Sequence, residues 1–246
     1  MNAGDWTGFC PICAREVLFR VTGPWYRDDL LCSSCGSIPR ERSVMVAIES
    51  VAPNWRALHI HESSPAPRGV SVRLQTECSR YVASQLFANT PLGSSRGGVR
   101  CEDLERQTFA AEQFDLVVTQ DVMEHVFEPS AAHREIWRTL RPGGHHVHTT
   151  PIVKRFVKSR RRAERNKDGS IAHLFEPVYH TNPVDPQGSL VTFDYGHDLP
   201  ELIAGWAPFD VEVRRFVDRH RGILGEMNDV IVCTKRVVHS GRSVVA

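Results

Sequence analysis

The segment from Phe114 to Pro151 constrains the fold more than any other part of the chain. It opens with a short apolar run at 114–120, which is typical of a buried parallel strand. Pro129 then suits the first turn of a helix, and apolar residues recur at spacing four over 132–140. Pro142-Gly143-Gly144 is expected to end that helix, and 145–149 reads as a second strand. The segment therefore predicts a strand–helix–strand unit of a parallel sheet.

The rest of the chain continues this alternation of strands and helices. We expect helices over 40–51, 69–79 and 199–206, and strands over 57–61, 81–84, 211–216 and 230–234. Parallel strands joined by helices form a doubly wound α/β sheet with right-handed crossovers. The sequence predicts a mostly parallel, seven-stranded, Rossmann-like sheet in a main domain of residues 40–236. A tail is expected at 237–246.

Composition fits one large domain with a small appendage. The chain has 246 residues, of which 41% are hydrophobic, and its formal net charge of +1 does not favour nucleic acid by itself. No signal peptide is visible and no stretch is long and apolar enough to span a membrane, so we expect a cytoplasmic protein without a membrane partner. Cysteines in that compartment are mostly reduced, and closely spaced pairs are better interpreted as metal ligands than as disulfides.

Two C-x-x-C pairs near the N-terminus predict a zinc ribbon at residues 1–39. Cys10 and Cys13 form the first pair, and Cys32 and Cys35 form the second about twenty residues later. Four thiolates at this spacing can occupy the corners of a tetrahedron, as they do in structural Zn²⁺ sites. Short strands at 17–21 and 29–31 would complete a ribbon too small to fold without a metal. A closed four-sulfur site predicts a structural role.

The segment FDLVVTQDVMEHV, followed by LRPGG at 140–144, resembles the second half of the class I S-adenosylmethionine (SAM) methyltransferase fold. The resemblance covers about 55–235 and is firm over 103–151. It implies SAM as the cofactor, methyl transfer as the reaction and a cofactor site at the carboxyl ends of the strands. The form H-E-S-S-P at 61–65, together with the cysteine pairs, resembles a methyltransferase-like subfamily that carries both.

The first loop departs from the pattern of the family. His59 stands where the family has an acid, and His61, Ser63 and Pro65 stand where it has glycines. Two interpretations remain open: the residues His61, Glu62, Ser63 and Ser64 bind the methionine part of SAM, or the site no longer binds SAM and the protein is a scaffold.

The resemblance implies further cofactor contacts in the later loops. Gln85 stands at the ribose-binding position, although a solvated loop glutamine is an alternative. Asp103 and Leu104 stand at the adenine position, because the spacing of Asp103 to Phe109 and Phe114 matches the family pattern; a helix-capping aspartate is the alternative. Gln120, at the end of the fourth strand, completes the expected set.

The loop after the fourth strand holds the catalytic candidates. His125 is a candidate general base because the intrinsic pKa of histidine lies near neutrality, and a structural bond to the backbone is the alternative. Asp121 could orient that base or hold an acceptor hydroxyl. Glu124 is expected to be a surface or capping group.

A long insertion at 152–198 is expected to form a lid over the acceptor. Its polar and aromatic side chains favour acceptor binding as a group, with Tyr179, His180, Asn182 and Tyr195 as the expected contacts. The insertion opens with a basic run at 154–167, which could contact RNA, bind an anionic acceptor or form a solvated helix. His145, His146 and His148 on the expected strand predict no second metal site.

These patterns favour a SAM-dependent methyltransferase with a structural zinc. The expected acceptor is a small molecule methylated on oxygen, such as a sugar or a secondary metabolite. An RNA methyltransferase that grips phosphate with the ribbon and the basic run is the alternative from another substrate class, and a non-methylating scaffold is the third. The sequence does not predict the oligomeric state.

Overall fold

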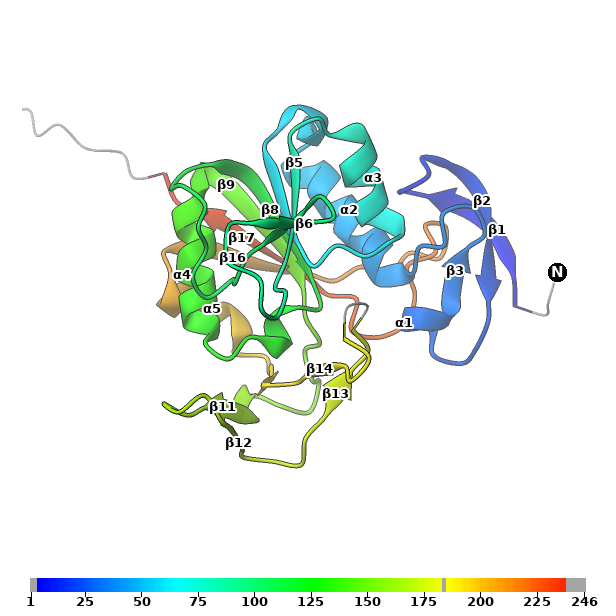
Figure 1. Ribbon diagram of the computed structural model, residues 1–246. Helices are drawn as coiled ribbons and strands as arrows, with labels where there is room; N and C mark the ends of the chain where they lie inside the picture. The colour runs from blue at the N-terminus through cyan, green and yellow to red at the C-terminus, as the bar shows by residue number, and fades with distance from the viewer. Residues whose placement is uncertain (1–3, 183–184, 238–246) are drawn as a thin grey trace, which may run out of the picture.

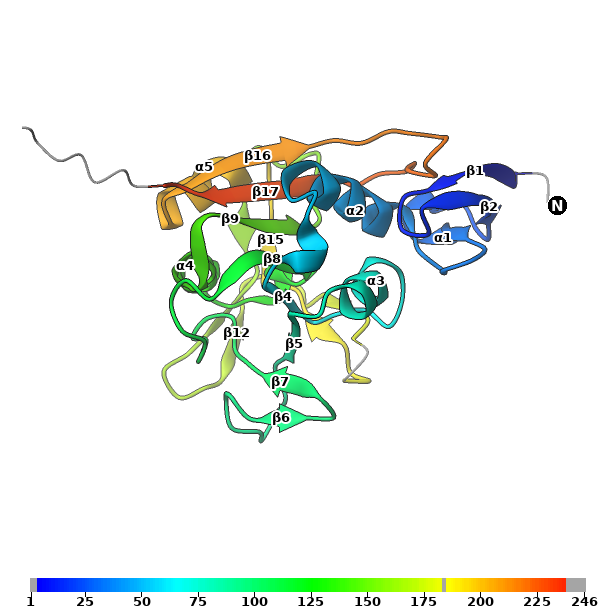
Figure 2. The same ribbon diagram turned by 90° about the horizontal axis from the view of Figure 1, so that it is seen from above.

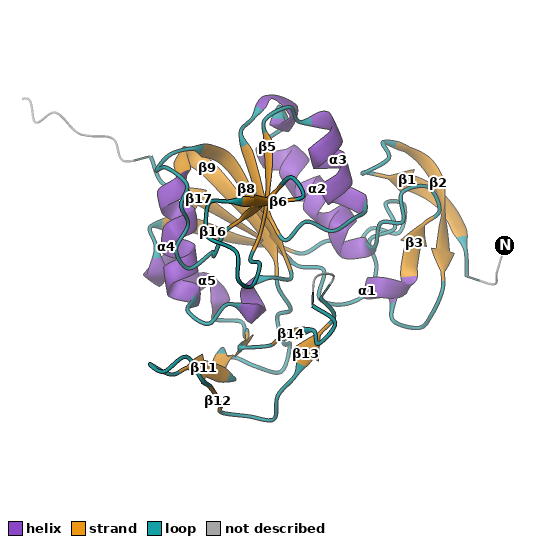
Figure 3. Cartoon of the chain, viewed as in Figure 1, coloured by secondary structure: helices purple, strands orange, loops and turns teal. Residues whose placement is uncertain are grey.

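The computed structural model describes residues 4–182 and 185–237. A small antiparallel sheet near the N-terminus lies beside a large mixed sheet that is covered by helices on both faces (Figures 1 and 3). All but the first residue of the tail expected at 237–246 lie outside the described residues. Within the described part of the chain, no helix has both the length and the apolar character needed to cross a membrane.

The N-terminal sheet has three antiparallel strands and a short helix. Strands β1 (Trp6–Cys10), β2 (Arg15–Val21) and β3 (Leu30–Cys32) pair in the order of the sequence, and α1 (Tyr26–Asp29) connects β2 to β3. Strand β1 was missing from the prediction, because its sequence, WTGFC, is only partly apolar. Phe19 and Leu30 are fully buried and join the same core cluster as Val44 and Ile48 of the main domain. The ribbon therefore shares a hydrophobic core with the main domain.

The large sheet has eight strands in the order β16-β17-β9-β8-β4-β5-β7-β6. Strands β4, β5, β7, β8 and β9 run parallel, while β17 is antiparallel to β9 and β16, and β6 to β7. The strand bounds are β4 (Ile60–Ser63), β5 (Tyr81–Gln85), β6 (Ser95–Arg96), β7 (Val99–Cys101), β8 (Phe114–Gln120), β9 (Leu140–Thr149), β16 (Phe209–Arg214) and β17 (Val230–Lys235).

Helices cover the sheet as two layers. Helices α2 (Pro39–Val51) and α3 (Gly69–Glu77) lie on one face, and α4 (Pro129–Thr139) and α5 (Leu199–Trp206) lie on the other (Figures 1 and 2). Strand β8 shows why its sequence is a continuous apolar run: Leu116 and Val118 join the core under α2, while Val117 joins the core under α4.

Three predictions about this sheet need correction. The sheet has eight strands rather than seven, because β6 folds back on β7 as a short edge hairpin. The first strand begins at Ile60, since Trp55–Ala57 forms a 3₁₀ turn. Helix α4 ends at Thr139, and Pro142-Gly143-Gly144 lies within β9 rather than at the helix end. Pro142 disfavours helical backbone at the residue before it, so the chain is extended from Leu140.

The insertion at 152–198 forms paired short strands instead of a helix. Its strands are β10 (Arg160–Arg161), β11 (Ala163–Arg165), β12 (Ile171–His173), β13 (Tyr179–His180), β14 (Ser189–Leu190) and β15 (Phe193–Asp194). They pair as β10-β15, β11-β12 and β13-β14. The basic run therefore lies on strands and turns, which corrects the expectation of a solvated helix.

Candidate active site

The carboxyl ends of β4, β5 and β8 bring most of the expected cofactor residues to one edge of the sheet. Ser63 pairs with Ser84 of β5 on one side and with Thr119 of β8 on the other, so Gln85 and Gln120 follow it at the same edge. Ligands bind at this edge in open parallel sheets. Ser64 has a φ of 59°, in the left-handed region where glycine is favoured. A serine thus makes the tight turn for which the family pattern has glycines.

Glu62 organises this edge from beneath. Its carboxylate accepts hydrogen bonds from Ser71 Oγ at 2.6 Å, Tyr81 Oη at 2.8 Å and Gln120 Nε2 at 3.0 Å. Burial raises the pKa of Glu62, although these three hydrogen bonds oppose the shift. Glu62 is 1% exposed, so its role in the structure is to tie three elements together rather than to face the solvent. Ser71 and Tyr81 were not predicted as part of the site. They lie inside a helix and a strand, and no motif in the sequence marks either of them.

His61 is a core residue, which corrects the expectation that it contacts the cofactor. Its side chain is fully buried and its Nε2 lies 2.7 Å from Ser84 Oγ. The imidazole packs against Phe109 and Phe114, with ring centroids 4.8 Å and 5.1 Å away. Burial lowers the pKa of His61 to about 3, helped by the nearby charge of Arg100. Alternation along β4 points His61 and Glu62 to opposite faces of the sheet.

Asp103 lies just after β7, in a turn that leaves its side chain partly accessible. Its Oδ1 accepts a hydrogen bond from the backbone of Glu105 at 3.0 Å, and the side chain is 19% exposed. Leu104 is buried in the core under α4. Gln85 is half-buried, and the Oε1 atom of Gln120 is buried without a hydrogen-bond partner among the described residues. An unpartnered buried amide oxygen is a candidate acceptor for a ligand donor.

Asp121 forms ion pairs, and its expected part in catalysis stays a prediction. Its Oδ2 pairs with Arg27 of α1 and, at 3.2 Å, with Arg40 of α2, while its Oδ1 accepts from Thr149 at 2.9 Å. Burial alone would raise the pKa of Asp121, but the two guanidinium groups hold it below its usual value. A carboxylate engaged in this way connects the N-terminal ribbon to the loop after β8 and has little basicity left for proton transfer.

His125, the candidate general base, lies in the short 3₁₀ turn after β8. Its Nδ1 lies 2.8 Å from the carbonyl oxygen of Leu190, and because a carbonyl only accepts, Nδ1 carries the proton. The other ring nitrogen, Nε2, keeps its lone pair in the neutral imidazole. The structural bond to the backbone that the sequence offered as an alternative is therefore present, and the second nitrogen remains available, so the role of general base stays a prediction.

Glu124 is buried rather than at the surface, which corrects its expected role. The side chain is 2% exposed, and its Oε2 accepts from Thr150 Oγ1 at 2.9 Å. Its Oε1 lies 3.9 Å from His125 Nε2 and 3.7 Å from Nδ1 of His180. The carboxylate of Glu124 and the imidazole of His125, both from the loop after β8, thus lie close to the imidazole of His180 on β13.

The other acceptor residues expected in the insertion differ in accessibility. Tyr179 is 55% exposed and remains able to contact a ligand. Asn182 instead stabilises the β13–β14 turn, donating to Ser189 Oγ at 2.8 Å. Tyr195 is fully buried and its hydroxyl donates to the carbonyl of Met123 at 3.0 Å, so its expected contact with an acceptor is corrected.

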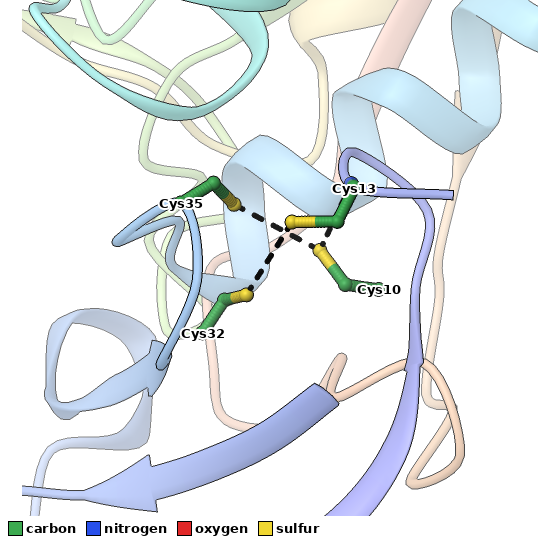
Figure 4. A group of neighbouring side chains, drawn as sticks. All are labelled: Cys10, Cys13, Cys32 and Cys35. Atoms are coloured by element: carbon green, nitrogen blue, oxygen red, sulfur yellow. Dashed lines mark hydrogen bonds between the residues drawn. The ribbon is translucent and has the colours of Figure 1, made fainter. Parts of the chain in front are cut away.

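The four paired cysteines converge at one end of the N-terminal sheet (Figure 4). Cys10 and Cys35 have their sulfur atoms 3.9 Å apart, and those of Cys13 and Cys32 are 3.7 Å apart. A tetrahedral zinc with Zn–S bonds of about 2.3 Å separates its sulfurs by about 3.8 Å, so the spacing fits this metal.

The surroundings of these sulfurs also suit a metal–thiolate group. Backbone N–H groups of Cys13 and Ser34 donate to sulfur atoms at 3.4 Å. The fully buried Arg42 supplies a positive charge beside the cluster and donates to the carbonyls of Leu30 and Gly222. Burial lowers the pKa of Arg42 to about 10, although the nearby thiolates favour its charged form. Four thiolates around one Zn²⁺ carry a net negative charge, which this arginine balances.

Part of the main domain is similar to a known protein family. Residues 75–148 match a family model described as a methyltransferase domain. No curated protein matches the sequence.

Solved structures of similar fold cover most of the chain. An S-adenosylmethionine dependent methyltransferase from Mesorhizobium loti shares 15% identity, covers 78% of this chain and 97% of its own, and has a TM-score of 0.49. The YcgJ protein of Bacillus subtilis shares 11% identity over 79% of this chain and 98% of its own, with a TM-score of 0.50. The 1,6-didemethyltoxoflavin-N1-methyltransferase of Burkholderia thailandensis, solved with that substrate and S-adenosylhomocysteine, shares 15% identity over 80% of this chain and 79% of its own, with a TM-score of 0.48.

The eight-stranded mixed sheet is thus a Rossmann-like methyltransferase fold. The domain match and this fold together support a class I SAM-dependent methyltransferase.

Proposed function

We propose that this protein transfers the methyl group of SAM to an oxygen atom of a small-molecule acceptor, such as a sugar or a secondary metabolite. The observation that carries the proposal is the edge formed by β4, β5 and β8. There Ser64, whose backbone lies in the left-handed region, makes the turn after β4. The buried Oε1 of Gln120 lacks a hydrogen-bond partner among the described residues. The match of residues 75–148 to the methyltransferase domain supports the same reaction.

The cofactor would contact side chains from four loops. Ser63 and Ser64 would hold the methionine part of SAM in the turn after β4, with Glu62 fixing that turn from beneath. Gln85 would bond the ribose hydroxyls, and Asp103 would accept from the adenine amino group. Gln120 would supply its unpartnered Oε1. The bond between Asp103 and the backbone of Glu105 holds the carboxylate in place, and the side chain remains partly exposed for a ligand.

The chemistry requires alignment and the loss of one proton. The bond between the methyl carbon and the sulfonium sulfur breaks, a bond from that carbon to the acceptor oxygen forms, and the hydroxyl proton leaves. His125 would promote that proton loss through Nε2, which the bond from Nδ1 to Leu190 leaves with its lone pair. Tyr179 and His180 would contact the acceptor, because both have exposed side chains on β13 and the ring of His180 lies against that of His125.

The contacts of the basic run weigh against an RNA substrate. Arg160 and Arg162 both pair with Asp194 at 2.8 Å, and Arg161 pairs with Glu128 at 3.2 Å. Guanidinium groups that already have carboxylate partners attract phosphate less strongly than free ones. These three arginines therefore help to fold the insertion.

Calorimetric titration with SAM and S-adenosylhomocysteine tests the cofactor site. We expect micromolar binding to the unaltered protein and at least about tenfold weaker binding to an Asp103→Ala variant. Asp168→Ala is the matched control, because Asp168 also accepts from the backbone two residues later, at 2.9 Å, but lies in an exposed turn of the insertion. No binding at millimolar ligand would exclude the methyltransferase reaction and favour a scaffold.

We also propose that Cys10, Cys13, Cys32 and Cys35 hold a structural zinc ion. The sulfur spacing, the N–H donors and the charge of Arg42 all support it. With four protein ligands the ion would have no open position, so it would fix the ribbon against α2 rather than act on the acceptor.

A further inference from the structure

Glu124, His125 and His180 bring together three side chains that can each donate one ligand atom to a metal ion, which methyl transfer by itself does not require. We propose that these three side chains bind a divalent transition-metal cation beside the acceptor. This reverses the expectation from sequence that there is no metal site besides the ribbon. The existence of the site is independent of the proposed methyl transfer, and only the role of the cation toward an acceptor rests on it.

The orphan oxygen of Glu124 is the first observation. Its carboxylate is almost fully buried, and Oε2 has a partner in Thr150 whereas Oε1 has none among the described residues. A buried carboxylate oxygen without a partner is costly. The two nearest ring nitrogens, at 3.7 Å and 3.9 Å, are too far away for hydrogen bonds. A cation between the three groups would satisfy all of them.

The distances suit a cation after a small contraction. The three ligand atoms lie within 4.8 Å of one another. Around a metal with bonds of about 2.0–2.2 Å, neighbouring ligand atoms lie about 3.0–3.5 Å apart. Each side chain would move by about 1 Å or less. His180 can make most of this adjustment, because its side chain is 41% exposed while that of Glu124 is fixed by burial.

The surroundings of the His125 imidazole are those of a metal ligand. Metal-bound histidines usually donate their second ring N–H to a carbonyl or carboxylate, which fixes the ring and its tautomer. His125 does this with the carbonyl of Leu190 on β14. Strand β14 pairs with β13, which carries His180, so one hairpin positions both histidines.

The backbone of Glu124 is held by the same insertion. Thr192 donates to the Glu124 carbonyl through its backbone N–H at 2.8 Å and its hydroxyl at 3.0 Å. The loop after β8 and the insertion therefore meet in a fixed arrangement, and the three donors come from these two segments only. A rigid support of this kind is what a metal site requires.

The donor types indicate which cation would bind. Two imidazoles and one carboxylate suit Fe²⁺, Co²⁺, Zn²⁺ and similar ions better than Mg²⁺ or Ca²⁺, which prefer oxygen ligands. Three protein ligands leave coordination positions open, unlike the four cysteines of the ribbon. The fully buried group of His133, His146 and His148 has three nitrogen donors as well, but no side chain reaches the solvent, so it offers no entry for an acceptor.

The open positions define an acceptor class if the proposed function holds. Two adjacent oxygen atoms, as in a vicinal diol, a catechol or a 2-hydroxy acid, could bind the cation together. A metal-bound hydroxyl loses its proton more readily, here to solvent water, and its oxygen then takes the methyl group while S-adenosylhomocysteine leaves. His125 would promote proton loss as a ligand of the cation rather than by accepting the proton itself.

The test is titration with Co²⁺ of the full chain, with zinc already bound at the cysteines, followed by visible absorption and metal analysis. We expect one further equivalent with d–d bands and no thiolate charge-transfer band, which only the cysteines can produce. His180→Asn and Glu124→Gln should each weaken this binding at least about tenfold. The exposed His173 of the same insertion gives the control, and His173→Asn should leave binding unchanged.

Several results would overturn the site. They are the absence of a second equivalent, a second equivalent with thiolate absorption, and equal binding by the His180→Asn variant, whose exposed side chain does not threaten folding. Circular dichroism checks the fold of Glu124→Gln. A SAM titration on the same samples separates the two proposals. SAM binding without the second metal would reject the site alone, whereas the second metal without SAM binding would reject the proposed function alone.

Discussion

At the scale of single residues, the environment of each histidine decides its chemistry. His61 and His125 are both close to the carboxyl edge of the sheet, yet His61 is enclosed by Phe109 and Phe114 while His125 keeps a free ring nitrogen. The sequence placed both near the cofactor but could not show which face of β4 a side chain occupies. Alternation puts neighbouring residues of β4 on opposite faces, but the face that Phe109 and Phe114 cover depends on residues distant in sequence. The predicted strand also began three residues too early.

Buried neutral histidines predict a loss of stability in mild acid. Burial lowers the pKa of His61 to about 3 and that of His133 to about 4, compared with about 6.5 in the unfolded chain. Below pH 6.5 the unfolded state takes up protons that the native state does not, so the free energy of unfolding falls as the pH falls. Each histidine contributes a slope of up to about 1.4 kcal/mol per pH unit.

Urea unfolding between pH 7 and pH 5 measures this slope. We expect His61→Gln to reduce the slope by roughly one histidine's share, because glutamine does not titrate. The matched variant His173→Gln, at an exposed position, should keep the slope of the unaltered protein. Equal slopes for His61→Gln and the unaltered protein would contradict the assignment of His61 to the core.

At the scale of elements, the main domain was predictable and the insertion was not. Strand β8 and helix α5 match their predicted bounds, because an unbroken apolar run and an apolar face at helical spacing are both local signals. The insertion has strands of two or three residues, whose pairing depends on partners distant in sequence, such as Arg160 with Asp194. Local patterns do not encode such pairings. The cysteines of the proposed zinc site could be predicted because their C-x-x-C spacing is a local pattern. Glu124 was wrongly placed at the surface because residues distant in sequence bury it.

Tyr195 of β15 provides a test of how the insertion supports the loop after β8. Its buried hydroxyl donates to the carbonyl of Met123, and a Tyr195→Phe change would leave that carbonyl without its partner. We expect a loss of about 1 kcal/mol in the free energy of unfolding, measured with urea. Tyr179→Phe on the exposed side of β13 should change it by less than about 0.5 kcal/mol. Unchanged stability of Tyr195→Phe together with weaker acceptor binding would restore the role predicted from sequence.

At the scale of the whole molecule, the ribbon and the main domain form one structure. Arg73 of α3 donates to the carbonyl of Pro11 between the first two cysteines, and Arg42 of α2 reaches Leu30 in β3. Trp6 of β1 donates to the carbonyl of Arg219. Because these contacts cross from one part to the other, loss of order in the ribbon should be felt in the main domain.

Removal of the proposed zinc tests this connection. We expect Cys35→Ala to lose one equivalent of zinc by elemental analysis and to lower the Tm, because a ribbon of this size does not fold without its metal. Cys101→Ala, at a buried cysteine outside the cluster, should keep its zinc. Unchanged zinc content after Cys32 and Cys35 are both replaced by alanine would show that the cluster holds no ion.

The pairing of Asp121 with Arg27 has a consequence for how the binding of zinc responds to the concentration of SAM. Arg27 belongs to the ribbon, and Asp121 begins the loop that follows β8 at the cofactor edge. Two binding equilibria that share a structural element are reciprocal: any factor by which zinc raises the affinity for SAM is the factor by which SAM raises the affinity for zinc. Where zinc raises the affinity for SAM, the chain would retain its metal best when the methyl donor is abundant and would lose it most readily when the donor is scarce.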